Sequence, residues 1–178
     1  MRVIRSLMFV LLTAFPCSAG AQSFVIQGSA GPTLVDSGYS VAGGIGFSPA
    51  SRVTVLFDVE RTHLSSRLTS DGRGGSTGFR GGTLTMGSAQ LRVTPLGRDR
   101  IGPYGLAGFA AGVSRPNVTE TFPDSVTNDV RAMFFGGGIH VPLNARVSLC
   151  VDGRMLIGAE AGELLALAPI RAGVAWRF

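Results

Sequence analysis

Residues 170–178 read IRAGVAWRF, and every second residue of this stretch is apolar. In an extended strand, successive side chains point to opposite faces, so the apolar set shares one face and the two arginines share the other. The apolar set is Ile170, Ala172, Val174, Trp176 and Phe178. Chain ends usually fray into water. An alternating row that ends on two large aromatics instead indicates a last strand that is held in a sheet.

The composition is unusual for a protein that dissolves in water. Charged residues make up 15% of the chain, against about 25% in ordinary globular domains, and the mean hydropathy is +0.32. Beyond the amino-terminal segment no apolar run approaches the 18 or so residues that a membrane helix needs. The remaining possibility is that apolar residues occupy every second position and face lipid around a β-barrel.

Two internal segments show the same alternation. Residues 52–62 read RVTVLFDVERT. One face carries Val53, Val55, Phe57 and Val59, and the other carries Arg52, Thr54, Asp58, Glu60 and Thr62. Residues 146–157 read RVSLCVDGRMLI and separate in the same way. A helical period would mix these two sets, whereas a strand keeps them apart.

Segments of this kind, separated by turn signals, predict an all-β chain of eight strands. They span residues 24–33, 38–48, 52–63, 80–94, 101–114, 129–141, 146–158 and 164–178. Short connections follow the second, fourth and sixth strands, and longer or more polar ones follow the odd-numbered strands. This pattern is typical of an antiparallel up-and-down transmembrane barrel with both termini at the end that carries the short turns.

Many of the 26 glycines lie inside the predicted strands, among Phe, Ile, Val and Leu, rather than in linkers. Small barrels have strongly tilted and coiled strands. We therefore expect these glycines to let neighbouring backbones and interior side chains fit.

The first 21 residues predict a secretory signal peptide. Arg2 and Arg5 precede an apolar run over 7–15, and Ala19-Gly-Ala21 offers a cleavage site. A lipoprotein anchored at Cys17 is the alternative, but residues 14–16 do not fit a lipobox. The domain organisation is thus a signal peptide at 1–21 and a barrel domain at 22–178.

Charge and cysteine content exclude several classes of function. The net charge is +5 and the isoelectric point is about 10.5, yet every basic residue is arginine and the arginines are scattered, so a nucleic-acid partner is not expected. Cys150 is the one cysteine left after cleavage, so no internal disulfide forms. Two separated histidines and one cysteine make no metal set, and we expect no cofactor.

The signal peptide, the eight alternating segments and the carboxyl terminus together resemble the small OmpA/OmpX-like outer-membrane β-barrel proteins. The segments GPYGLAGFAAGV and FFGGGIHVPLNARVSLCVDGR are similar to strand pairs of that superfamily. The resemblance implies localisation in the outer membrane of a Gram-negative envelope. It also implies that Ile170, Ala172, Val174, Trp176 and Phe178 form the signal read by the barrel assembly machinery.

If the apolar face points to lipid, a set of charged residues points into the lumen and should pair there, because unpaired buried charge is costly. This set is Arg52, Asp58, Glu60, Arg92, Asp152, Arg154, Arg171 and Arg177. We expect a salt-bridge plug, with a narrow passive pore as the alternative. A soluble lipocalin-like barrel would instead place the apolar row inside.

An enzymatic alternative rests on His63-Leu-Ser65, which resembles the His-x-Ser motif of the lipid A deacylases. The family's following asparagine is Ser66 here, and no carboxylate lies nearer downstream than Asp71, so we expect no catalysis and no catalytic residues. The long loops are better candidates for binding. Arg67, Arg73 and Arg80 suit phosphates, and the expected partners are outer-membrane lipid and lipopolysaccharide. We expect a monomer with a structural or surface-interaction role.

Overall fold

The computed structural model describes residues 23–34, 38–65, 81–118, 126–160 and 162–178 with their side chains, and 67–70 and 76–79 as backbone alone. The predicted signal peptide at 1–21 lies outside these residues. No helix in the described part of the chain is long and apolar enough to cross a membrane.

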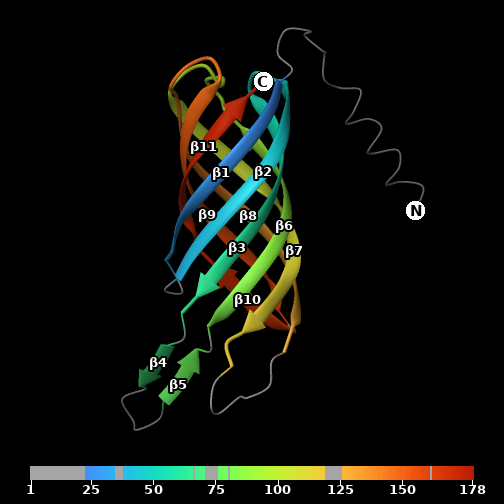
Figure 1. Cartoon of the computed structure of the whole chain (residues 1–178), viewed down its shortest axis with the longest axis vertical. Helices are drawn as coiled ribbons and strands as arrows, with labels where there is room; N and C mark the ends of the chain where they lie inside the picture. The colour runs from blue at the N-terminus through green and yellow to red at the C-terminus, as the bar shows by residue number, and fades with distance from the viewer. Residues whose placement is uncertain are drawn as a thin grey trace, which may run out of the picture.

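The structure is a closed antiparallel barrel, which confirms the predicted fold class (Figure 1). Its wall consists of β1 Ser23–Thr33, β2 Gly38–Ala50, β3 Val53–Leu64, β6 Gly82–Val93, β7 Gly102–Pro116, β8 Asn128–Pro142, β9 Val147–Glu160, β10 Glu163–Leu167 and β11 Ile170–Arg177. The strands β10 and β11 together make the eighth strand, because both pair with β9. Each predicted segment overlaps one wall strand.

The barrel closes between the last strand and the first. Strand β11 pairs with β1 in a register that runs from Val25 opposite Arg177 to Ala30 opposite Ala172. The other edge of β11 pairs with β9, and β9 pairs with β8. The alternating stretch that ends the sequence is therefore hydrogen-bonded on both sides, and the wall has no open edge there.

Two features of the strands differ from the predictions. The stretch expected to be a plain loop after β3 contains a short hairpin, β4 Arg67–Ser70 and β5 Ser76–Phe79, which forms its own two-stranded sheet. These strands have four residues each and no alternating apolar row, so periodicity gave no signal for them. The last strand is interrupted at Ala168-Pro169, where proline has no N–H to give to the ladder.

The ends of the barrel differ in the length of their connections. The start of β1, the carboxyl terminus and the short turns after β2, β6 and β8 lie at one end, which we call the turn end (Figure 1). The connections after β1, β3, β7 and β9, including the β4–β5 hairpin, lie at the other, which we call the loop end. This arrangement agrees with the predicted up-and-down topology.

The outer surface of the wall is apolar. Phe109 on β7 is 69% exposed and Phe24 on β1 is 66% exposed, and exposed Val, Ile, Leu or Met side chains lie on each of the other wall strands. Aromatic rings gather toward the ends, with Trp176 against Phe178 at the turn end and Tyr39 against His63 at the loop end. The lipocalin-like alternative required the opposite, an apolar interior row with polar residues outside.

Glycines occupy inward and outward positions for different reasons. A side chain on inward Gly138 would have its Cβ 2.0 Å from the carbonyl oxygen of Val151 on the neighbouring strand. A Cβ on outward Gly105 would have no atom within 4 Å. The inward glycine is therefore needed for the close approach of the strands in a narrow barrel, whereas the outward one is not.

This difference predicts opposite outcomes for one substitution at two positions. Gly138→Leu should lower the free energy of unfolding by at least about 1–3 kcal/mol, because the wall must shift to admit the side chain. Gly105→Leu should fold normally. The folded fraction of each is measured from its unboiled band on a gel, since folded barrels run at a different apparent mass until heated. Equal folded fractions would contradict this account of the glycines.

Candidate functional site

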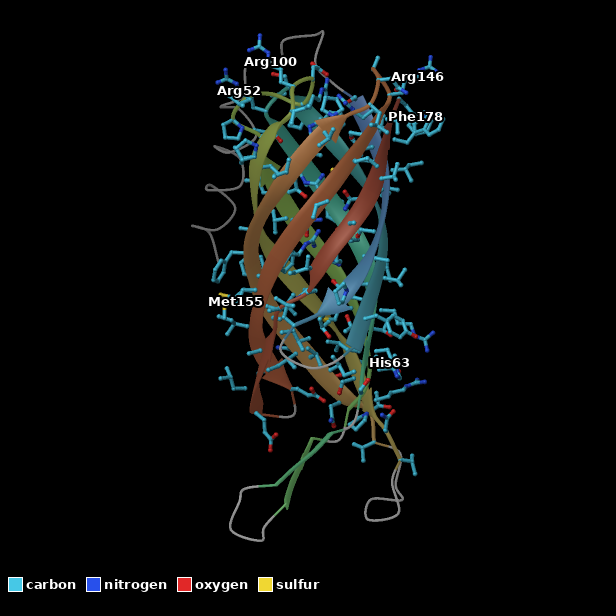
Figure 2. All side chains as sticks on the ribbon, turned by 90° about the vertical axis from the view of Figure 1, so that its left-hand side faces the viewer. Arg52, His63, Arg100, Arg146, Met155 and Phe178 are labelled. Atoms are coloured by element: carbon cyan, nitrogen blue, oxygen red, sulfur yellow. The ribbon has the colours of Figure 1, made fainter. Side chains whose placement is uncertain are left out.

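The structure places seven members of the predicted lumen charge set in the barrel interior. Each is at most 7% exposed: Asp58, Glu60, Arg92, Asp152, Arg154, Arg171 and Arg177. The prediction for Arg52 is wrong, because this residue is exposed in the turn before β3 begins. Side chains alternate between the two faces only within a strand, so the even position of Arg52 gave no information about where its side chain points. Figure 2 shows Arg52 at the turn end, near Arg100.

A ring of side chains crosses the lumen at mid-height, which we call the central ring: Gln27, Asp58, Arg154, Asp152, Tyr104 and Arg92. The Gln27 amide donates to Asp58 at 2.9 Å, and Asp58 lies 4.0 Å from the Arg154 guanidinium. Arg154 donates to Asp152 at 2.7 Å, and the Tyr104 hydroxyl donates to the other Asp152 oxygen at 2.9 Å. Five strands therefore converge on one polar cluster.

Arg92 closes the central ring without an ion pair. Its guanidinium lies 4.6 Å above the Tyr104 ring and donates to the Gln27 carbonyl oxygen at 3.1 Å. Its other terminal nitrogen contacts the Cys150 sulfur at 3.8 Å. In the described part of the chain no carboxylate reaches it, so a cation–π contact and an amide stabilise this buried charge.

Two further charge pairs flank the central ring. Toward the loop end, Arg171 lies 2.8 Å from Glu60, as an ion pair without hydrogen-bond geometry, and Thr62 donates to the other Glu60 oxygen at 3.2 Å. At the turn end, Arg177 pairs with Asp99 at 3.1 Å, although Asp99 is largely exposed. Opposite charges of the predicted set thus lie together inside the lumen at the central ring and at the Glu60–Arg171 pair, whereas Arg177 pairs with an exposed turn residue outside that set.

The loop-end half of the lumen is filled by apolar side chains, which sequence reasoning missed. Leu64, Leu84, Met86, Leu106, Val130, Phe134, Leu156 and Leu167 belong to this buried cluster. Those on β3, β6 and β9, and Leu167 in the last strand, have the same parity as the inward charged residues of those strands, which was the available signal; β7 and β8 carry no member of the predicted charge set. It was not used because leucine is equally common on a lipid-facing wall.

Little space remains inside the barrel. A cavity among Gln27, Arg92, Cys150 and Arg154 has a volume of about 10 Å³, which suits about one water molecule. Within the described residues, there is no group of three or more His, Cys, Asp or Glu side chains that could hold a metal ion. The arrangement is one that fills and stiffens a barrel.

The residues of the enzymatic alternative lie at the loop end. His63 is on the outer wall, where its ring packs 5.4 Å from that of Tyr39 (Figure 2), and Ser65 is exposed just after β3. Ser66 and Asp71 lie outside the described residues. Of the predicted loop-binding residues, Arg73 and Arg80 also lie outside, and Arg67 is described as backbone in β4.

The predicted assembly signal lies on the outer wall. Val174 and Trp176 are each 47% exposed, Ile170 is 39% exposed and Phe178 is 68% exposed, and Ala172 is exposed beside them. The Phe178 amide donates to the Phe24 carbonyl at 3.0 Å, which ties the chain end to β1. Recognition of this row by an assembly factor stays a prediction.

Comparison with known proteins gives matches among solved structures. The TM-score is 0.67 for Neisserial surface protein A, at 13% identity, with 88% of this chain and 97% of that chain covered. It is 0.60 for the amino-terminal barrel domain of OprF from Pseudomonas aeruginosa, at 15% identity and the same coverage. It is 0.52 for Ail of Yersinia pestis, at 13% identity, covering 88% and 98%.

Neither a family model nor a curated protein sequence matches this chain. At these identities the structural matches show the fold, and that fold is the one of the small eight-stranded outer-membrane barrels. The resemblance stated from the sequence is thereby confirmed at the level of architecture.

The buried pair of Glu60 and Arg171 gives a test of the interior. Glu60→Leu should lower the free energy of unfolding by about 3–5 kcal/mol, because it leaves Arg171 buried without its partner. The double variant with Arg171→Met should recover most of that loss, since no charge is then stranded. Urea unfolding of the folded barrel measures both. A single variant as stable as the unaltered protein would contradict the pairing.

Proposed function

We propose that this protein is an integral outer-membrane barrel whose filled interior makes it a rigid support for long connections at the cell surface, with a structural or surface-interaction role. The observation that carries the proposal is the combination of an apolar outer wall with a lumen closed by charge pairs and an apolar cluster. Such a wall is stable in lipid, where backbone groups must all be paired within the protein.

The filled lumen argues against the narrow passive pore. An ion would have to pass the central ring and then the apolar cluster behind it, and the cavity between the side chains has a volume of about 10 Å³. Eight-stranded barrels have interiors that side chains can fill, whereas wide channels need many more strands. Catalysis has no assembled nucleophile and base to support it in the described residues, so we propose a role without catalysis.

The loop end is the favoured place for interaction with partners, because binding residues concentrate on loops held by a rigid scaffold. Its mouth has an apolar floor that includes Leu64, Leu84 and Leu165, within a pocket of about 460 Å³. Glu160 on its wall accepts hydrogen bonds from Ser114 and Asn128. Ail of Yersinia pestis was solved in complex with a heparin analogue, sucrose octasulfate, which supports surface recognition as a role for this fold.

The proposed orientation is tested by labelling intact cells. In a Cys150→Ala background, Ser65→Cys should react with a membrane-impermeant maleimide, because Ser65 is exposed at the loop end. Ser51→Cys is the matched control, since Ser51 is exposed in a turn at the opposite end. It should react only after the cells are opened. Labelling of Ser51→Cys alone on intact cells would contradict the proposed orientation, and labelling of neither would contradict surface exposure.

The absence of conduction is tested in a planar bilayer. The folded protein should show no discrete single-channel steps, because side chains of the central ring and the apolar cluster fill the lumen below the mouth. A 16-stranded porin inserted into the same bilayer is the positive control, since its lumen is an aqueous channel. Reproducible steps from the purified barrel would overturn the closed-lumen proposal and restore the pore.

A further inference from the structure

The outer wall is hollowed where β2, β3, β6 and β7 run side by side. The hollow has a volume of about 710 Å³ and its lining is apolar. Its floor consists of outward residues with little or no side chain, Gly43, Gly87, Ala89 and Ala111, and Phe57 and Phe109 stand beside them. Figure 1 shows these four strands adjacent on one side of the barrel.

The small residues are not imposed by the barrel's own packing. A Cβ on Gly87 would have its nearest neighbour at 4.0 Å, and one on Gly43 at 3.9 Å, which are ordinary contacts. Inward glycines such as Gly138, in contrast, leave no room for a side chain. The barrel would therefore accept larger residues here, and the hollow needs another explanation.

Three outward arginines lie around the loop-end side of the hollow. Arg131 is the cross-strand partner of Ala111 in the hollow floor, and Arg61 follows Val59 by one outward position on β3. Arg115 lies four residues beyond Ala111 on β7. All three side chains are exposed, and none forms an ion pair with any residue that the structure describes.

The spacing of the arginines suits a ligand that carries two phosphates. Arg61 on β3 and Arg131 on β8 are separated by β6 and β7. At about 4.8 Å per strand, these two strands are therefore roughly 14 Å apart along the curved wall. A lipid that carries two phosphates on one sugar headgroup can contact both arginines at once. Guanidinium groups suit phosphates, and the apolar hollow suits an acyl chain.

We propose that this surface, the hollow with Arg61, Arg115 and Arg131, binds one bisphosphorylated, multiply acylated glycolipid of the outer leaflet, of the lipid A type. An acyl chain occupies the hollow and the two phosphates contact arginines on both sides of it. The inference rests on the proposed function, because it requires the loop end to face the cell surface. It places lipid recognition on the wall rather than on the loops.

A second copy of the chain fits this surface less well. Two copies in one membrane share the same orientation, so a symmetric contact through the hollow brings the arginines of both copies to one level. Like charges held together near lipid repel each other. A phosphorylated lipid instead neutralises them, and the three arginines outnumber the exposed carboxylate of Asp129 beside them on β8, so charge complementarity favours the lipid.

The test is native mass spectrometry of the folded barrel in detergent micelles, titrated with bisphosphorylated hexa-acyl lipid A. The protein should retain one lipid molecule, and monophosphoryl lipid A, which lacks one phosphate, should bind about tenfold more weakly, as expected for one lost charge-assisted contact. This comparison uses the unaltered protein and does not depend on any variant folding. Equal retention of the two lipids, or no retention, would overturn the proposal.

Variants then locate the site. Gly87→Leu fills the hollow and should weaken lipid A binding about tenfold. Gly153→Leu on β9, where a Cβ has no atom within 4 Å, is the matched control and should leave lipid A binding unchanged. Arg131→Gln should weaken lipid A binding and remove the preference for two phosphates. Arg146→Gln, in an exposed turn at the opposite end (Figure 2), should change neither.

The variants also separate this inference from the proposed function. Each is first checked for the heat-dependent gel shift of a folded barrel. Unchanged lipid A binding in folded Gly87→Leu and Arg131→Gln would overturn the wall site, even if labelling at Ser65 had placed the loop end outside the cell. Failure of that labelling would instead overturn the orientation on which both proposals rest.

Discussion

The hydrogen-bonded closure of β11 on β1 is the constraint on which the rest of the structure depends. An unpaired strand edge in lipid leaves a row of backbone N–H and C=O groups without partners, each at a cost of several kcal/mol. Closure removes both edges at once, and it explains why the chain needs a well-formed strand up to its last residues. Trp176 and Phe178 then lie at the turn end, where aromatic rings suit the membrane interface.

Once the barrel is closed, the alternation of each strand becomes a division between wall and lumen. In the proposed membrane setting, outward positions contact lipid and require apolar side chains, so the polar residues of the same strands are confined to a narrow interior. There the buried charges must find partners, and they do so across strands: Glu60 on β3 meets Arg171 on β11, and Asp58 lies near Arg154 of β9. Arg92 shows that an aromatic face and an amide can replace a carboxylate.

Periodicity predicted the strands, the topology, the outer face and the inward position of most charges, because each of these depends on the parity of residues within one strand. The pairing of the charges was not predictable. It depends on the stagger between strands, and the partners Glu60 and Arg171 are distant in sequence. The prediction for Arg52 was wrong for a related reason, since the alternation assigns a residue to a face only when the first residue of the strand is known. The apolar cluster was missed because leucine on an inward position looks the same as leucine on the wall.

The glycines also show what the sequence alone could not predict, and some of them form part of the floor of the outer hollow. In the sequence, Gly138 and Gly87 are both glycines inside alternating strands. In the structure, the first lies where another strand's backbone leaves no room, and the second faces outward with space around it. Strand packing explains Gly138 but not Gly87, because a larger apolar residue on the wall would add β propensity and contact with lipid. A hollow floored by such residues, and bordered by arginines that form no ion pair with any residue the structure describes, is therefore better explained by a ligand than by folding.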